Sequence, residues 1–204
     1  MIRKIHYFSG LTISVFVALH LCNHVWSIAG AEQHIELMNT LRLLYRNPLV
    51  EILLLTAVFV QILSGINLWR RTRKTMTKDF EKLHIYTGLY LAFFLFIHVS
   101  AVLGGRFYLK LDTNFYFGVA GLNTFPTNLF FIPYYSFAIL AFFGHVASIH
   151  SKKMKRSLLG LTPRQQSIFI LIVGFFLTIL ILYGLTNKFN GVIIPPAYKV
   201  LTGK

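Results

Sequence analysis

Five long apolar runs divide the chain into segments of similar length. They cover residues 10–30, 48–69, 84–103, 129–149 and 164–186. Each run has about the 20 residues that an α-helix needs to cross a bilayer. The second and fifth runs begin at Asn47-Pro48 and Thr162-Pro163, a polar residue followed by proline, which is a typical helix start. The pattern predicts an all-α integral membrane bundle of five transmembrane helices that forms a single domain over residues 1–204.

Two further segments separate the runs on one side of the expected membrane. Within residues 31–46, one helical stripe carries apolar side chains, namely Ile35, Met38, Leu41 and Tyr45. This stripe predicts an interfacial helix between the first and second spans. Residues 105–126 are rich in aromatic side chains, which is typical of the boundary between membrane and water.

The composition supports a membrane location and indicates an orientation. Apolar residues make up 55% of the chain and charged residues only 13%, with a mean hydropathy of +0.63, whereas a soluble domain is about 25% charged. The net charge of +14 comes from bases that flank the apolar runs, so it marks membrane topology rather than a nucleic-acid partner. Thirteen bases lie in the N-terminus and in residues 70–83 and 151–165, against seven on the other side. The N-terminus is therefore expected to face the cytoplasm or the mitochondrial matrix, and the C-terminus the outside of that inner membrane.

An internal repeat places histidines on two of the predicted spans. Residues 4–11 (KIHYFSGL) align without gaps with residues 82–89 (KLHIYTGL). In each unit a second histidine follows the first by 14 residues, and these second histidines are His20 and His98. Each lies 16 residues beyond the lysine of its unit, which is roughly 24 Å along a helix. Both are therefore expected at the same depth, in the outer half of the membrane.

Two imidazoles at equal depth on parallel helices can approach a metal from opposite sides. This arrangement suits bis-histidine ligation of a haem iron in the core of a helix bundle. A neutral imidazole costs less to bury than a charged group, and iron would satisfy its nitrogen. His24 lies one turn beyond His20 on the same face, so it is either an alternative ligand or part of an outer pocket. We place His20 first because only His20 has a partner in the repeat.

The remaining histidines lie near the ends of the predicted spans. His6, His84 and His150 fall at the inner interface, where we expect surface positions or contacts to haem propionates. His34 lies in the outer segment and is expected to be exposed to solvent.

The order of these motifs resembles the five-helix, dihaem cytochrome b subunit that anchors succinate dehydrogenases and fumarate reductases in the membrane. The resemblance covers residues 3 to about 150 and includes a fifth span. It rests on Arg3-Lys4-Ile5-His6, His20-Leu21, Ala31-Glu32, residues 49–52 (LVEI), Gly65, Thr87-Gly88, His98 and His145. The resemblance to this succinate:quinone oxidoreductase family implies a haem b subunit that carries electrons between an iron–sulfur protein and membrane quinone. It also implies that a flavoprotein and the iron–sulfur protein dock on the inner face.

One ligand position departs from the family pattern. The family binds two stacked haems through four histidines. His20 and His98 match the ligands of the haem farther from the soluble subunits, and His145 matches one ligand of the nearer haem. The partner of His145 falls at Gln61, which a weaker echo of the internal repeat also aligns with His145.

Glutamine is not an ordinary haem ligand. Either the inner haem is lost, which the sequence favours, or His145 alone holds it. A quinone in the vacated inner pocket would then lie beside polar residues that have no other assigned partner, namely Gln61, Ser64, His84 and His145.

Two other functions stay open on sequence grounds. One is a haem-free structural or assembly anchor that kept the fold. The other is a different transmembrane b-type cytochrome, which would need haems at two depths. The chain has no flavin or iron–sulfur motif, and its single cysteine, Cys22, cannot hold a cluster, so it is not expected to oxidise succinate alone. Quinone chemistry also needs protons; Glu32, Glu36 and Glu51 are the acids nearest the outer pocket, and Glu32 and Glu36 are expected to be solvated.

Overall fold

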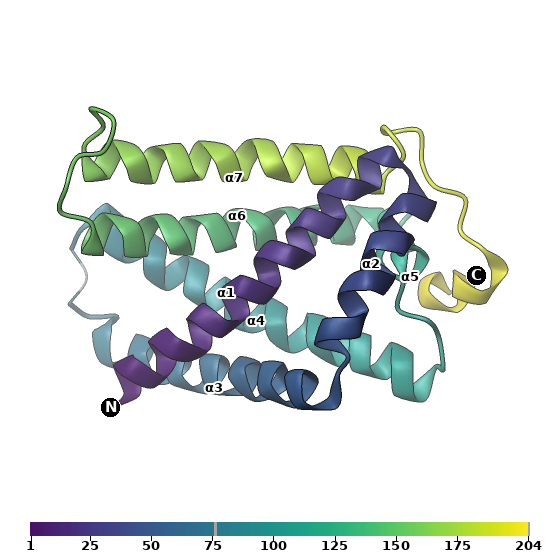
Figure 1. Ribbon diagram of the computed structural model, residues 1–204, viewed down its shortest axis with the longest axis horizontal. Coiled ribbons are helices and arrows are strands. Elements are labelled where there is room, and N and C mark those ends of the chain that lie inside the picture. Colours follow the sequence, from purple (N-terminus) through teal and green to yellow (C-terminus); the bar gives the residue numbers. More distant parts are fainter. Residues whose placement is uncertain (76, 204) are drawn as a thin grey trace.

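The computed structural model describes residues 1–75 and 77–203, and these residues form helices joined by loops (Figure 1). Five helices are long and apolar enough to cross a membrane. They are α1 (Ile2–Trp26), α3 (Pro48–Thr72), α4 (Asp79–Leu103), α6 (Asn128–Lys153) and α7 (Pro163–Leu185). The shorter elements are η1 (Ser27–Ala29), α2 (Ala31–Tyr45), η2 (Gly104–Tyr108), α5 (Phe115–Val119) and η3 (Pro196–Thr202). The prediction of an all-α bundle with five membrane spans is confirmed.

Local sequence signals explain several helix boundaries. The side chains of Asn47 and Thr162 accept hydrogen bonds from the backbone N–H groups of Leu49 and Gln165, so both predicted starts are N-caps followed by proline. α1 and α4 begin well before the expected residues 10 and 84. Their first turns hold charged and polar residues that continue a helix beyond the apolar run, because a helix need not end where the membrane ends.

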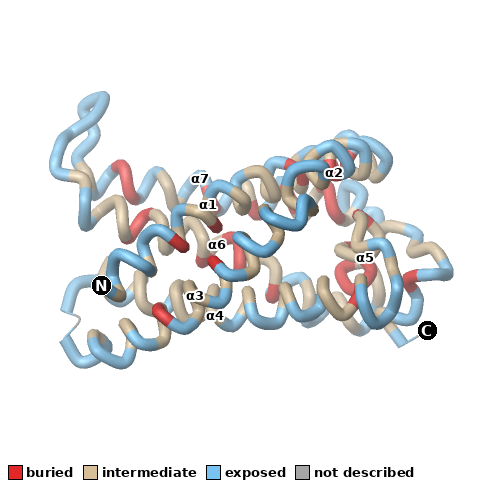
Figure 2. Tube along the Cα trace, turned by 60° about the horizontal axis from the view of Figure 1, so that its bottom comes forward, coloured by how far each residue is buried: buried red, intermediate tan, exposed pale blue. Residues whose placement is uncertain are grey.

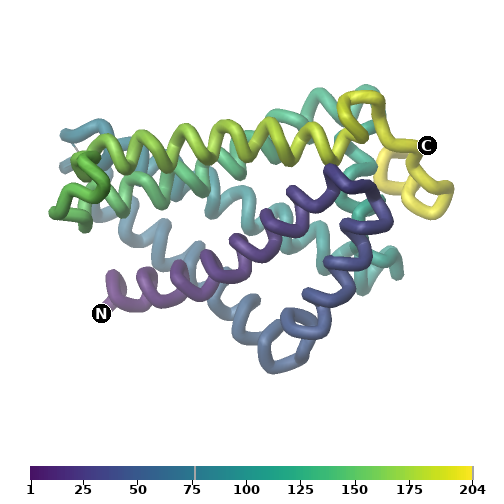
Figure 3. The backbone as a smooth tube through the Cα atoms, turned by 45° about the horizontal axis from the view of Figure 1, so that its top comes forward, coloured from purple at the N-terminus to yellow at the C-terminus, as the bar shows by residue number. Residues whose placement is uncertain are grey.

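The five long helices form a ring. α1 packs on α3, α3 on α4, α4 on α6, α6 on α7, and α7 on α1. α1 and α7 meet where Gly184 lies against Ser27 and Ile28 of η1. From that point the two helices diverge toward the N-terminus (Figures 1 and 3).

The two ends of the bundle differ in what covers them (Figure 1). One end, which we call the basic end, holds the N-terminus and the loops after α3 and α6. It therefore carries the larger group of bases counted in the sequence. The opposite end, which we call the capped end, holds η1, α2, η2, α5 and the C-terminal segment.

A cluster of buried apolar side chains lies at the capped end, where α5 is drawn as buried (Figure 2). Six buried side chains from the α5 region, α6 and α7 form its centre: Phe115, Val119, Leu122, Ile139, Ile181 and Leu185. The aromatic segment expected at the membrane boundary is therefore divided. Phe115 is buried in the protein, whereas Phe107 and Tyr108 are exposed. α2 buries Met38 and leaves Leu43 exposed, so the predicted apolar stripe faces the protein.

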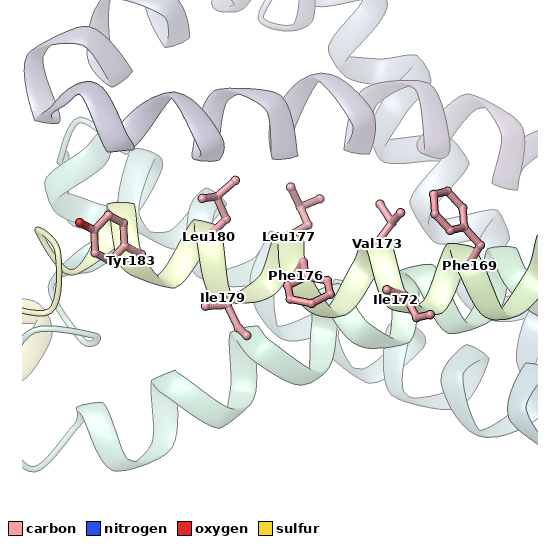
Figure 4. A pocket seen from close by; sticks show the side chains of 8 residues that line it. All are labelled: Phe169, Ile172, Val173, Phe176, Leu177, Ile179, Leu180 and Tyr183. Atoms are coloured by element: carbon pink, nitrogen blue, oxygen red, sulfur yellow. The ribbon is translucent and has the colours of Figure 1, made fainter.

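The outward face of α7 is apolar along most of its length. The side chains that line a shallow groove on this face are Phe169, Ile172, Val173, Phe176, Leu177, Ile179, Leu180 and Tyr183 (Figure 4). Only the hydroxyl group of Tyr183 is polar. Such a face suits contact with lipid, so polar chemistry is to be sought inside the ring.

Candidate functional site

The internal repeat corresponds to two equivalent helix pairs, α1–α3 and α4–α6. A methyl group added at Gly10 would lie 3.2 Å from the amide nitrogen of Gln61 in the first pair. A methyl group added at Gly88 would lie 3.2 Å from the ring of His145 in the second pair. Gln61 and His145 therefore occupy equivalent places against equivalent glycines, in agreement with the weak echo in the sequence.

His20 of α1 and His98 of α4 face each other inside the ring. Their ring centres are 6.2 Å apart, and their planes are inclined by 65°. Phe16 stacks on His20 at 5.6 Å and 17°, and Phe94 stacks on His98 at 5.0 Å and 13°. Each imidazole is thus held by an aromatic ring one turn earlier on its own helix.

The chemistry and spacing of this pair fit the axial ligands of a haem. Metal–imidazole bonds of about 2 Å on both sides of one metal atom place two ring centres roughly 6 Å apart. In the part of the chain that the structure describes, no group of three or more His, Cys, Asp or Glu side chains could hold a metal ion. Haem iron needs only two protein ligands here, because the porphyrin supplies the other four nitrogens.

His24 connects α1 to α2 instead of pairing with His98. Its Nε2 atom lies 3.1 Å from Nε2 of His20, and its Nδ1 atom lies 3.4 Å from Nε2 of His34. Asn23 Nδ2 lies 3.2 Å from the same His34 nitrogen. Of His20 and His24, it is His20 whose ring packs against the ring of His98, with centres 6.2 Å apart.

The expectation that His34 is exposed to solvent is wrong. His34 is 3% exposed, because α2 folds over the capped end and places the imidazole against the ring of Phe115 at 5.2 Å. Burial, together with the charge of nearby Arg42 and the neighbouring His20, lowers the pKa of His34 to about 4. A signal was present in the sequence: His34 lies four residues before Met38, on the edge of the predicted apolar stripe.

A second group of polar side chains lies toward the basic end of the ring, and we call it the basic-end cluster. It consists of His6, Gln61, Ser64, His84 and His145. His6 Nδ1 lies 2.8 Å from Ser64 Oγ, and Gln61 Nε2 lies 3.3 Å from His6 Nε2. His84 and His145 stack with their ring centres 4.1 Å apart.

The structure therefore gives His6 and His84 a more internal place than the sequence suggested. Both were expected at the surface or at haem propionates, but each lies against the side chains of a partner helix and is only partly exposed. His150 is different: its Nε2 atom lies 2.8 Å from Oε1 of Gln166, on α7, and it takes no part in the cluster. The sequence missed the inward direction of His6 because nothing in one repeat unit shows which face packs on α3.

The acids of the outer region lie away from the His20–His98 pair. Glu32 and Glu36 are exposed on α2, as expected for solvated side chains. Glu51, at the start of α3, forms an ion pair and hydrogen bond with Arg106 of η2. Polar side chains do contact the pair: His24 Nε2 lies 3.1 Å from His20 Nε2, and the ring centre of Tyr135 lies 6.1 Å from that of His98.

Comparison with protein-family models, with curated proteins and with solved structures gives no match.

Proposed function

We propose that the chain is the haem b-containing membrane anchor of a succinate:quinone oxidoreductase, that is, of a succinate dehydrogenase or a fumarate reductase. The observation that best supports this proposal is the His20–His98 pair, in which imidazoles of two helices meet inside the ring at a metal-bridging spacing. His20 and His98 hold the haem iron. The protein then carries electrons between an iron–sulfur partner subunit and membrane quinone.

The side chains around the pair prepare it for this role. Bound haem supplies one-electron chemistry. Phe16 and Phe94 stack on the two imidazoles and restrict their rotation. Hydrogen bonding and burial around a metal ligand are means by which proteins set the reduction potential of the metal.

The basic end is the proposed docking face for the flavoprotein and the iron–sulfur protein. It carries the N-terminus and the two most basic loops. The positive-inside rule puts this end in the cytoplasm or the mitochondrial matrix, in an inner membrane. Because the two termini lie at opposite ends of the bundle (Figure 1), we expect the C-terminus outside.

An absorbance spectrum of the purified protein tests the proposal. The dithionite-reduced protein is expected to show the α-band of a low-spin b-type haem. His98→Ala is expected to remove the haem at the His20–His98 level, while the control His150→Ala, at a histidine bonded only to Gln166, retains it. Circular dichroism and gel filtration in detergent establish that both variants are folded.

The outcome also separates the alternatives. A folded protein without any haem band would contradict the proposal and leave a haem-free structural or assembly anchor. A haem band that survives His98→Ala unchanged would show that other residues bind the iron. Copurification with a flavoprotein and an iron–sulfur protein distinguishes the proposed complex from a different transmembrane b-type cytochrome.

A further inference from the structure

We propose that the loop between α6 and α7 binds the surface of an anionic membrane: leucines at its turn enter the lipid interface, and neighbouring bases bind lipid phosphates. The loop covers residues 154–162, and we call residues 158–161 (LLGL) the leucine turn. The proposal does not depend on haem binding. It uses only the proposed orientation, because the leaflet on the cytoplasmic side carries anionic lipid.

The leucine turn presents apolar side chains outside the bundle. Leu159 is 100% exposed, and Leu158 and Leu161 are exposed as well. In two views the loop rises past the start of α7, on the outer side of the bundle (Figures 1 and 2). Three leucines within four residues form an apolar patch, whereas a single exposed leucine is normal on a protein surface. Such a patch indicates contact with a membrane or with another molecule.

The backbone of the turn holds this patch in a conformation that leucine disfavours. Leu158 and Leu161 exchange two backbone hydrogen bonds, of 3.1 and 2.9 Å, around a two-residue turn. Leu159 and Gly160 have φ angles of 51° and 77°. Positive φ at both central residues is typical of a type I′ turn, where asparagine or aspartate usually precedes glycine. The leucine at this position is strained, so the needs of the turn do not explain it.

Gln166 of α7 fixes the loop against the bundle. Its side chain is buried, and its Nε2 atom donates to the carbonyl oxygens of Arg156 at 3.2 Å and Leu161 at 2.7 Å. Its Oε1 atom lies 2.8 Å from Nε2 of His150, near the end of α6. One amide group thus ties both arms of the loop to the bundle and holds the leucine turn in a defined position.

The start of α7 puts the loop at the level of the lipid headgroups. Along α7 the exposed residues change from polar, at Arg164 and Gln165, to apolar, at Ile168 and Phe169. The hydrocarbon region therefore begins near Ile168. Thr162, where the loop ends, lies six residues earlier, which is about 9 Å along the helix axis. The headgroup layer on each side of a bilayer is roughly 5–8 Å thick, so the leucine turn lies within reach of the interface.

The charges beside the turn complement an anionic surface. Lys155, Arg156 and Arg164 are exposed, and within the described residues none of the three forms an ion pair. The sequence after Asp112 contains no acidic residue, so no carboxylate close in the chain offsets these bases. Apolar side chains flanked by bases are typical of segments that lie in the interface of an anionic membrane. A membrane therefore fits this loop better than a protein partner does.

A fluorophore at the turn tests the proposal. Cys22 is the single cysteine of the chain, so Cys22→Ser/Leu159→Cys has one labelling site for nitrobenzoxadiazole, whose emission depends on its surroundings. The labelled protein is reconstituted into vesicles of phosphatidylcholine and phosphatidylglycerol. We expect blue-shifted emission and quenching by lipids that carry a nitroxide close to the headgroup. The matched control is Cys22→Ser/Thr75→Cys, at an exposed position in the loop after α3, where we expect emission as in water.

Two further variants separate the role of the bases from that of the leucine. Lys155→Gln/Arg156→Gln in the labelled protein is expected to lose most of the quenching, and so are vesicles of phosphatidylcholine alone. Leu159→Asn relieves the strain of the turn, so we expect it to raise the melting temperature in detergent. Added phosphatidylglycerol is expected to stabilise the unaltered protein more than this variant. A leucine that served only to pack the fold would give a lower melting temperature on replacement.

The outcomes that would overturn the proposal are distinct. Emission and quenching at position 159 that match those at position 75 in anionic vesicles would show that the turn stays in water. Shielding of position 159 that appears only when soluble partner subunits are added would assign the loop to protein docking instead. Haem does not enter these measurements, so their failure is distinguishable from failure of the proposed function.

Discussion

Replacing His34 by glutamine is expected to remove one contribution to the acid sensitivity of this protein. The folded state holds the His34 imidazole neutral, with a pKa lowered to about 4 by burial between α2 and the capped end. In an unfolded chain the same group has its usual pKa of 6.5. Below pH 6.5 the unfolded state therefore binds a proton that the folded state excludes.

The sign of the effect follows from proton linkage. Above pH 6.5, the titration of His34 does not affect the free energy of unfolding. As the pH decreases below 6.5, the free energy of unfolding decreases, and this decrease ends near pH 4, where the folded state also binds the proton. The difference between the two pKa values, 6.5 and about 4, corresponds to about 3.5 kcal/mol when about 1.4 kcal/mol is counted for each pH unit. For a chain of this length that lowers the melting temperature by roughly 7–14 °C.

The assay is thermal unfolding in detergent, followed by far-ultraviolet circular dichroism at several pH values from about 7.5 to 4.5. His34→Gln, which keeps a polar group near Asn23, and His34→Leu, which keeps only bulk, are both expected to lose less stability on acidification than the unaltered protein. A packing defect would lower the melting temperatures of the two variants by different amounts, and it would do so at every pH. Parallel pH profiles for the unaltered protein and both variants would refute the reasoning.

Two further predictions concern helix contacts. Gly184→Ala would place a methyl group 3.0 Å from the backbone nitrogen of Ile28, and overpacking of this kind costs about 1–3 kcal/mol. The melting temperature of this variant is expected to fall. The matched control is Gly104→Ala, where the added methyl group meets nothing within 4 Å. Equal melting temperatures for the two variants would contradict the close contact of α7 with η1. Glu51→Gln breaks the partly buried ion pair with Arg106 and is expected to lower the free energy of unfolding by about 1–2 kcal/mol. A double-mutant cycle with Arg106→Gln measures the coupling between the two side chains. Additive effects would show that the pair contributes nothing to stability.

The five membrane-spanning helices could be predicted from the sequence because each span carries its own local signal. Apolar length, the proline starts after Asn47 and Thr162, and the distribution of bases depend on local sequence, so no knowledge of helix packing is needed. The repeat predicted that His20 and His98 lie at the same depth, because equal spacing from a lysine fixes the depth of a residue on any straight helix.

The directions in which side chains point were harder to predict from the sequence. His34 was expected in water because the segment around it is polar, but α2 turns one face onto the capped end and buries it. The sequence also gave no direction for His6, whose ring lies against Ser64 of α3 in the structure. Both cases have one cause: the depth of a residue follows from counting, whereas its rotation about the helix axis depends on the neighbouring helices.

The two levels of histidines bear on the path of electrons through the proposed anchor. His6 and His20 lie 14 residues apart on α1, and His84 and His98 are equally spaced on α4, which separates the levels by about 21 Å. A single haem at the His20–His98 level would leave that length of apolar helix between the iron and the basic end, where the partner subunits are proposed to dock. The repeat unit contains one histidine at each level, so both copies of the unit carry the same two-level spacing.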